Sequence, residues 1–141
     1  MPVYFDTSAL IKLYVAEDGT PAVCAAWDDA AVVVSCWLLY PEMIATFARK
    51  RREAVIPADK LDAAEAEFRR DWLTLARIAC DDDLIRRIDL LHARHQLRGA
   101  DSTHLAAALK YRDLYGEPLT FACADLQLRT AANAEGLLVV P

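Results

Sequence analysis

The sequence predicts an α/β fold in which a small parallel sheet of four to five strands lies between two layers of helices. Short apolar runs alternate with amphipathic stretches along the whole chain, which is typical of strands joined by right-handed helical crossovers. The run from Ala31 to Val34 is continuously apolar, as expected of a strand buried on both faces of a parallel sheet. Only 4 Gly and 6 Pro argue against a turn-rich all-β fold. We therefore expect a three-layer sandwich.

Length and composition predict one domain over residues 1–141 with a sizeable core, because 55% of the residues are hydrophobic. The net charge of −5 argues against nonspecific adhesion to DNA. A nucleic-acid enzyme stays open if metal ions and local basic patches offset the acidic charge. No apolar run reaches the roughly 18 residues that span a bilayer, and no signal peptide is evident. We expect a cytoplasmic protein with no membrane contact.

The strands are predicted from short apolar runs bounded by polar or turn-forming residues. These runs lie at residues 2–6, 31–36, 77–80, 119–123 and 137–140. The run at 77–80 gives the weakest strand signal, and we expect a short edge strand there. The first run ends on Asp6, and Asp125 follows the fourth run.

The helices are predicted from apolar residues at helical spacing and from capping signals. They cover residues 8–15, 20–29, 37–52, 57–75, 81–96, 102–115 and 126–134. Thr20 is predicted to cap the second helix with Pro21 behind it, and Asp101 to cap the sixth. The third and fourth helices both fall between the second and third strands. We therefore expect them to form a helical arm outside the sheet.

Four carboxylates stand at the ends of predicted elements. Asp6 and Asp125 follow strands, Glu42 lies in the first turn of the helix after the second strand, and Asp101 begins the sixth helix. Ligands bind at the carboxyl ends of strands in open parallel sheets, so Asp6, Asp125 and Glu42 should converge there if their strands are neighbours. Asp101 follows no strong strand, and its position cannot be derived from the pattern.

Clustered carboxylates repel one another, and burial raises their pKa values. A hard divalent cation such as Mg²⁺ or Mn²⁺ resolves both costs, because it takes oxygen ligands and binds phosphate oxygens. It can also activate a water for attack on a phosphodiester. Each acid has an ordinary alternative role, since Asp101 and Asp125 can cap helices and Glu42 is favoured in a first helical turn.

These residues resemble the motifs of PIN domains, and most closely those of VapC-type toxins of bacterial and archaeal toxin–antitoxin pairs. The resemblance covers nearly the whole chain. It rests on FDTSAL at residues 5–10, Glu42, RGADSTHLAAA at residues 98–108 and FACAD at residues 121–125. It implies a PIN-like sandwich and metal-dependent cleavage of RNA. By resemblance, Asp6, Glu42, Asp101 and Asp125 are the catalytic, metal-binding acids.

The resemblance also implies partners. Relatives bind the C-terminal segment of an antitoxin on the helical arm, and they commonly form homodimers. We therefore expect an RNA substrate, a cognate antitoxin that binds the helical arm, and a homodimer. One position departs from the pattern: Cys123 stands where many relatives carry Ser or Thr. A hydroxyl there could orient a metal-bound water, and a thiol is a poorer substitute. Ser8 is expected to support the first acid with its hydroxyl.

Several other residues allow more than one functional or structural interpretation. His104 lies one helical turn after Asp101 and either packs in the core or points to the site. The basic run at residues 49–52 either ends a solvated helix or contacts RNA or an acidic partner. His92 and His95 lack a third zinc ligand. The four cysteines, Cys24, Cys36, Cys80 and Cys123, are expected to be free thiols, with a structural zinc site as the alternative.

The sequence thus predicts a metal-dependent endoribonuclease that acts as a toxin. Two alternatives stay open: a non-toxic PIN nuclease of RNA processing, and a catalytically silent PIN-like binding module. Retention of all four acids argues against the second. A phosphoaspartyl phosphatase would need an acid where Ser8 stands, and a receiver domain would need an acidic pair near the first strand and a late lysine.

Overall fold

Five parallel strands form the centre of the molecule. The computed structural model describes residues 1–141, and its sheet has the order β3-β2-β1-β4-β5 with every neighbouring pair parallel. The strands are β1 (Val3–Phe5), β2 (Val33–Cys36), β3 (Ala76–Ile78), β4 (Thr120–Ala122) and β5 (Leu138–Val140). The strand order runs outward from β1 in both directions. The switch point, where ligands bind in such sheets, therefore lies between β1 and β4.

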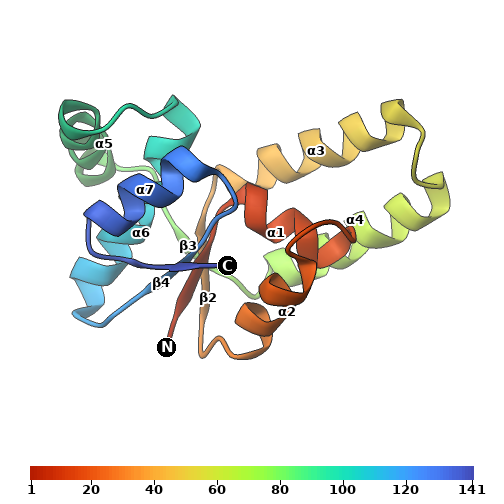
Figure 1. Cartoon of the computed structure of the whole chain (residues 1–141), viewed down its shortest axis with the longest axis horizontal. Helices are drawn as coiled ribbons and strands as arrows, with labels where there is room; N and C mark the ends of the chain where they lie inside the picture. Colours follow the sequence, from red (N-terminus) through yellow and green to blue (C-terminus); the bar gives the residue numbers. More distant parts are fainter.

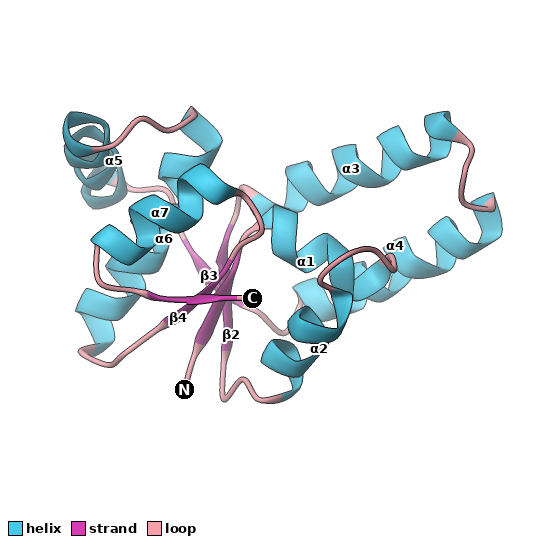
Figure 2. Cartoon of the chain, viewed as in Figure 1, coloured by secondary structure: helices cyan, strands magenta, loops and turns pink.

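Seven helices cover the two faces of this sheet (Figures 1 and 2). One layer holds α1 (Thr7–Tyr14), α2 (Thr20–Asp28), α3 (Leu39–Glu53) and α4 (Ala58–Trp72). The other holds α5 (Asp82–Arg94), α6 (Gly99–Tyr115) and α7 (Leu126–Ala134). The predicted three-layer α/β sandwich with a parallel sheet is therefore confirmed, and so is the edge strand β3.

The alternation of side chains along β1 divides the core into two parts. Val3 and Phe5 join a cluster of 14 buried residues beneath α1 to α4. Tyr4 points the other way, into a cluster of 18 buried residues beneath α5 to α7, where it stacks on Phe121. All three residues of β1 are buried, as expected of the central strand of a parallel sheet.

Helices α3 and α4 form the predicted arm, which projects from the sheet as a helical hairpin (Figure 1). Its inner faces meet through Phe47 and Phe68, whose ring centroids lie 6.2 Å apart. Tyr14 of α1 packs edge-on against Phe68 and so ties the base of the arm to the body. The arm thus continues the core of one layer.

Three local predictions are wrong. Helix α4 ends at Trp72, three residues before the predicted end at Leu75. Thr20 is not an N-cap: Gly19, with a φ of 91°, holds that position, and the Thr20 hydroxyl donates to the carbonyl of Lys12. Asp101 is not an N-cap either. The amide of Ser102 already bonds to the carbonyl of Arg98, so α6 begins at Gly99 and Asp101 lies inside its first turn.

None of the seven helices combines the length and the apolar character that a bilayer crossing requires.

The arm core gives a first prediction. Phe68→Ala should lower the free energy of unfolding by about 3 to 5 kcal/mol, because Phe68 is fully buried among aromatic rings. Leu73→Ala, at a residue that is 73% exposed, is the control and should change it by less than about 0.5 kcal/mol. Urea denaturation measures both. Equal effects of the two substitutions would show that the arm does not share the core.

Candidate active site

Two of the four predicted acids lie at the carboxyl ends of neighbouring strands. Asp6 follows β1 and Asp125 follows β4 after two residues, and these strands pair in parallel register. The amide of Asp6 donates to the carbonyl of Ala122 at 3.1 Å, which continues the ladder as far as the first acid. Both carboxylates therefore stand at the switch point of the sheet.

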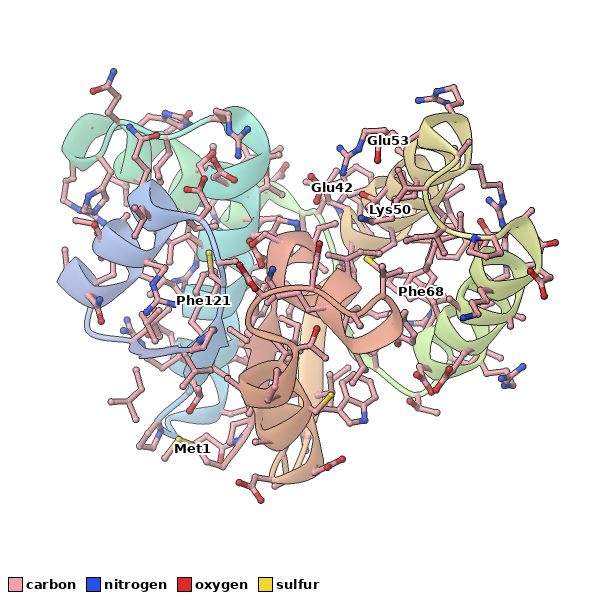
Figure 3. All side chains as sticks on the ribbon, turned by 45° about the vertical axis from the view of Figure 1, so that its right-hand side comes forward. Met1, Glu42, Lys50, Glu53, Phe68 and Phe121 are labelled. Carbon is pink, nitrogen blue, oxygen red and sulfur yellow. The ribbon has the colours of Figure 1, made fainter.

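The other two acids are delivered by helix starts. Glu42 lies in the first turn of α3, which follows β2, and Figure 3 places it where the two helical layers meet. Asp101 lies in the first turn of α6, which packs across β2 and β3. The packing of α6 supplies the convergence of Asp101 that the sequence pattern could not. All four carboxylates line one cavity of about 230 Å³.

The Asp6 side chain is nearly removed from solvent, with the residue 4% exposed. Its Oδ1 accepts the amide of Ala9, which caps α1, and the Ser8 hydroxyl lies 2.8 and 2.9 Å from the two carboxylate oxygens. Burial raises the pKa of Asp6, while the nearby charge of His104 and these hydrogen bonds oppose that rise. Asp6 is thus a buried carboxylate held by a helix cap and a hydroxyl.

Glu42 is fixed through one oxygen. Its Oε1 accepts hydrogen bonds from the Thr7 hydroxyl at 2.8 Å and pairs with His104 Nε2 at 2.5 Å. Burial alone would raise the pKa of Glu42, but the hydrogen bond and charge of His104, together with Thr7, hold it below its ordinary value. The second oxygen of Glu42 has no hydrogen-bond partner in the protein.

His104 is packed in the core and also reaches the site, so both sequence readings describe part of its role. It is 2% exposed, and its Nδ1 pairs with the Tyr4 hydroxyl at 2.9 Å. Burial disfavours the imidazolium, but contacts with Cys36 and Glu42 outweigh this effect and raise the pKa of His104 to about 10. His104 therefore links the centre of the sheet to Glu42.

Arg98 is the residue of the site that sequence reasoning missed. Its Nε donates to Asp101 Oδ2 at 2.9 Å, and its Nη2 lies 3.8 Å from Asp125 Oδ2. Asp125 also caps α7 by accepting the amide of Leu128 at 3.0 Å. The contact could have been predicted from spacing, because Arg98 lies three residues before Asp101 and residues three apart lie on the same side of a helix.

Cys123 lies behind the acids. Its Sγ is 3.9 Å from the Ser8 hydroxyl, which also accepts the amide of Ala124 at 3.0 Å. Burial and the charge of Asp6 raise the pKa of the Cys123 thiol, so it stays protonated at neutral pH. The hydroxyl that contacts Asp6 here therefore comes from Ser8.

The donor set suits a hard divalent cation, because the cavity is lined by four carboxylates and by the three hydroxyl residues Thr7, Ser8 and Thr46. As they stand, no three His, Cys, Asp or Glu side chains lie close enough together to hold an ion. The Arg98 guanidinium lies between Asp101 and Asp125, where a cation would draw the carboxylates together. The chemistry of these oxygen donors fits such a cation.

The cysteines, His92 and His95 form no metal site, and one residue of the basic run reaches the cavity. All four cysteines are free thiols. His92 pairs with Ser102 and His95 with Glu135, so the two histidines share no ligand position. Within the basic run at 49–52, Arg49 lines the cavity and pairs with Glu53 at 3.5 Å.

Comparisons with known proteins decide the family. A family model described as PIN domain matches residues 3–114. This chain belongs to the PIN-domain family. Two curated PIN relatives are Ribonuclease VapC45 of Mycobacterium tuberculosis strain CDC 1551 / Oshkosh and Ribonuclease VapC49 of strain ATCC 25618 / H37Rv. Each is 35% identical over 140 residues, which span 99% of this chain and 94% of the relative.

A solved structure has the same fold as this chain. The crystal structure of M. tuberculosis VapC20, a Sarcin-Ricin loop cleaving toxin, superposes with a TM-score of 0.64. The match covers 96% of each chain at 17% sequence identity. At this identity the likeness shows the PIN fold alone.

The Ser8 contacts give a second prediction. Ser8→Ala removes the hydroxyl that bonds to Asp6 and accepts the Ala124 amide, so the free energy of unfolding should fall by about 1 to 2 kcal/mol. Thr130→Val removes an exposed hydroxyl that bonds to a helix carbonyl, and should change it by less than about 0.5 kcal/mol. If urea denaturation gives the same value for both variants, the Ser8 hydroxyl does not hold Asp6.

Proposed function

We propose that this chain is a divalent-metal-dependent endoribonuclease of the VapC type and acts as the toxin of a toxin–antitoxin pair. The observation that carries this proposal is the gathering of Asp6, Glu42, Asp101 and Asp125 around one cavity at the switch point of the sheet. Names of the relatives support the activity, since both curated relatives are ribonucleases over nearly the whole length of this chain.

The cofactor we propose is Mg²⁺, with Mn²⁺ as a substitute. When bound, such an ion lowers the pKa of a water and stabilises the leaving oxygen of a phosphodiester. Asp6 and Asp101 would be its principal ligands, because they are the most buried of the four acids and gain most from a cation. Glu42 would offer its second oxygen and Asp125 its Oδ2 from the edge of the cavity.

The remaining residues of the site position these acids. Ser8 and the amide of Ala9 fix the Asp6 carboxylate, so that its orientation does not depend on the ion. Thr7 and His104 fix Glu42 through Oε1 and keep it charged, which suits a ligand of a divalent cation. We propose that the protein contributes mainly this preorganised set of charges.

A cognate antitoxin is proposed to bind the helical arm. An apolar groove of about 230 Å³ lies where the end of α1 meets the α3–α4 connection and α4. It is lined by Tyr14, Val15, Ala16, Ile56, Lys60, Leu61 and Ala64. A groove of this kind suits the apolar face of an amphipathic segment. Homodimerisation stays a prediction that light scattering in solution would test.

We also propose that residues 1–141 act as one domain in the cytoplasm. The sheet supports the first part, because β1 near the start of the chain pairs with β4, and β4 pairs with β5 near the end of the chain. Of the alternatives, the silent binding module is disfavoured by the four acids in one cavity. The non-toxic PIN nuclease is separated from the toxin only by experiment.

Cleavage itself gives the third prediction. The protein with Mg²⁺ or Mn²⁺ should cut RNA, EDTA should stop the reaction, and Asp6→Asn should lower the rate by about a hundredfold or more. Asparagine caps helices as well as aspartate does, so α1 should stay folded in this variant.

The matched control is Asp89→Asn, which makes the same change on the exposed surface of α5 and should leave the rate unchanged. Circular dichroism would confirm that both variants fold. Cleavage that persists in EDTA, or full activity of Asp6→Asn, would contradict the metal-dependent mechanism.

The toxic role gives the fourth prediction. Induced expression of the wild-type chain should arrest bacterial growth, and co-expression of the cognate antitoxin should restore it. Asp6→Asn should be harmless, because it lacks the charge that we assign to the metal site. Normal growth of cells that contain active wild-type enzyme would favour the RNA-processing alternative.

A further inference from the structure

Arg98 is an exposed cationic side chain that pairs with two of the acids assigned to metal, Asp101 and Asp125. Its guanidinium spans Asp101, with Nε 2.9 Å from Oδ2 and Nη2 3.4 Å from Oδ1, and reaches Asp125 at 3.8 Å. The side chain is 75% exposed. Arg98 occupies the N-cap position of α6, and its side chain makes no capping hydrogen bond to the backbone of that helix.

Asp101 requires a positive partner. The residue is 7% exposed and lies at the cavity with Asp6, Glu42 and Asp125, whose charges repel its own. Arg98 supplies the compensating charge in the metal-free protein. A divalent cation on Asp101 would supply the same charge from inside the cavity and would repel a guanidinium a few ångströms away.

Building on the proposed function, we propose that Arg98 is a displaceable counter-cation: it neutralises Asp101 and Asp125 in the metal-free protein and leaves them when a divalent ion binds. The exchange costs little because water solvates the exposed Arg98 side chain after it leaves, while the divalent ion replaces its charge at Asp101. The released guanidinium then lies at the mouth of the cavity, where its planar fork suits a phosphate of the RNA backbone.

Arg49 provides the matched comparison. It lines the same cavity and carries the same charge, but it pairs with Glu53 on its own helix and bonds to none of the four acids. Arg49→Gln therefore removes one positive charge from the cavity without removing a competitor for the metal ligands. Arg98→Gln removes both.

The first experiment measures free Mn²⁺ by electron paramagnetic resonance during titration of the metal-free protein. Arg98→Gln should bind Mn²⁺ about fivefold more tightly than the wild type, and Arg49→Gln about twofold or less, because only the general charge effect remains. Arg98→Lys keeps the charge but not the fork, and should fall between Arg98→Gln and the wild type.

The result that overturns the exchange is an Mn²⁺ affinity of Arg98→Gln equal to that of Arg49→Gln. This failure is distinct from failure of the proposed function, in which the wild-type chain itself would bind no Mn²⁺.

The second experiment measures steady-state cleavage of a single-stranded RNA at saturating Mn²⁺. There Arg98→Gln should raise KM about threefold or more and change kcat less, because it removes a phosphate contact. An unchanged KM would overturn the contact with RNA.

Discussion

The structure depends on the burial of negative charge at the carboxyl edge of the sheet. Asp6 directly follows the central strand, and Asp101 is almost as deeply buried beside it. Removing carboxylates from water is costly unless hydrogen bonds or cations replace the lost solvation. Each acid has such partners: a helix cap and a hydroxyl for Asp6, a hydroxyl and an imidazole for Glu42, and the Arg98 guanidinium for Asp101 and Asp125. The elements around the cavity are arranged so that these partners are within reach.

The topology explains why the acids meet. Strands β2 and β3 lie on one side of β1, and β4 and β5 lie on the other. The strand order therefore reverses between β1 and β4, and Asp6 and Asp125 follow the carboxyl ends of these two strands. Helix α3 leaves β2 at the same edge and carries Glu42 in its first turn. Helix α6 crosses the opposite face and brings both Asp101 and His104 to the cavity. Two helical layers and two strands thus contribute to one site.

The sequence predicted the sandwich, the arm and the strand-end acids because these follow from periodicities along the chain. Asp101 could not be placed from periodicity, since its convergence depends on how α6 packs across the sheet. The predicted cap at Thr20 failed because Gly19 takes the left-handed backbone there and the Thr20 hydroxyl bonds to Lys12 of the preceding helix. The contacts of Thr7, His104 and Arg98 with the acids are tertiary, and no local pattern identifies the partner of a hydroxyl, an imidazole or an exposed guanidinium.

We propose that these acids together hold a divalent ion, and the decisive experiment is a crystal structure of the wild-type protein grown with Mn²⁺. Anomalous diffraction at the manganese edge would locate the ion. We expect a peak inside the cavity, about 2.0 to 2.2 Å from oxygens of Asp6 and Asp101, with the Arg98 side chain turned away from Asp101. Absence of a peak from the cavity at an Mn²⁺ concentration that supports RNA cleavage would contradict the account.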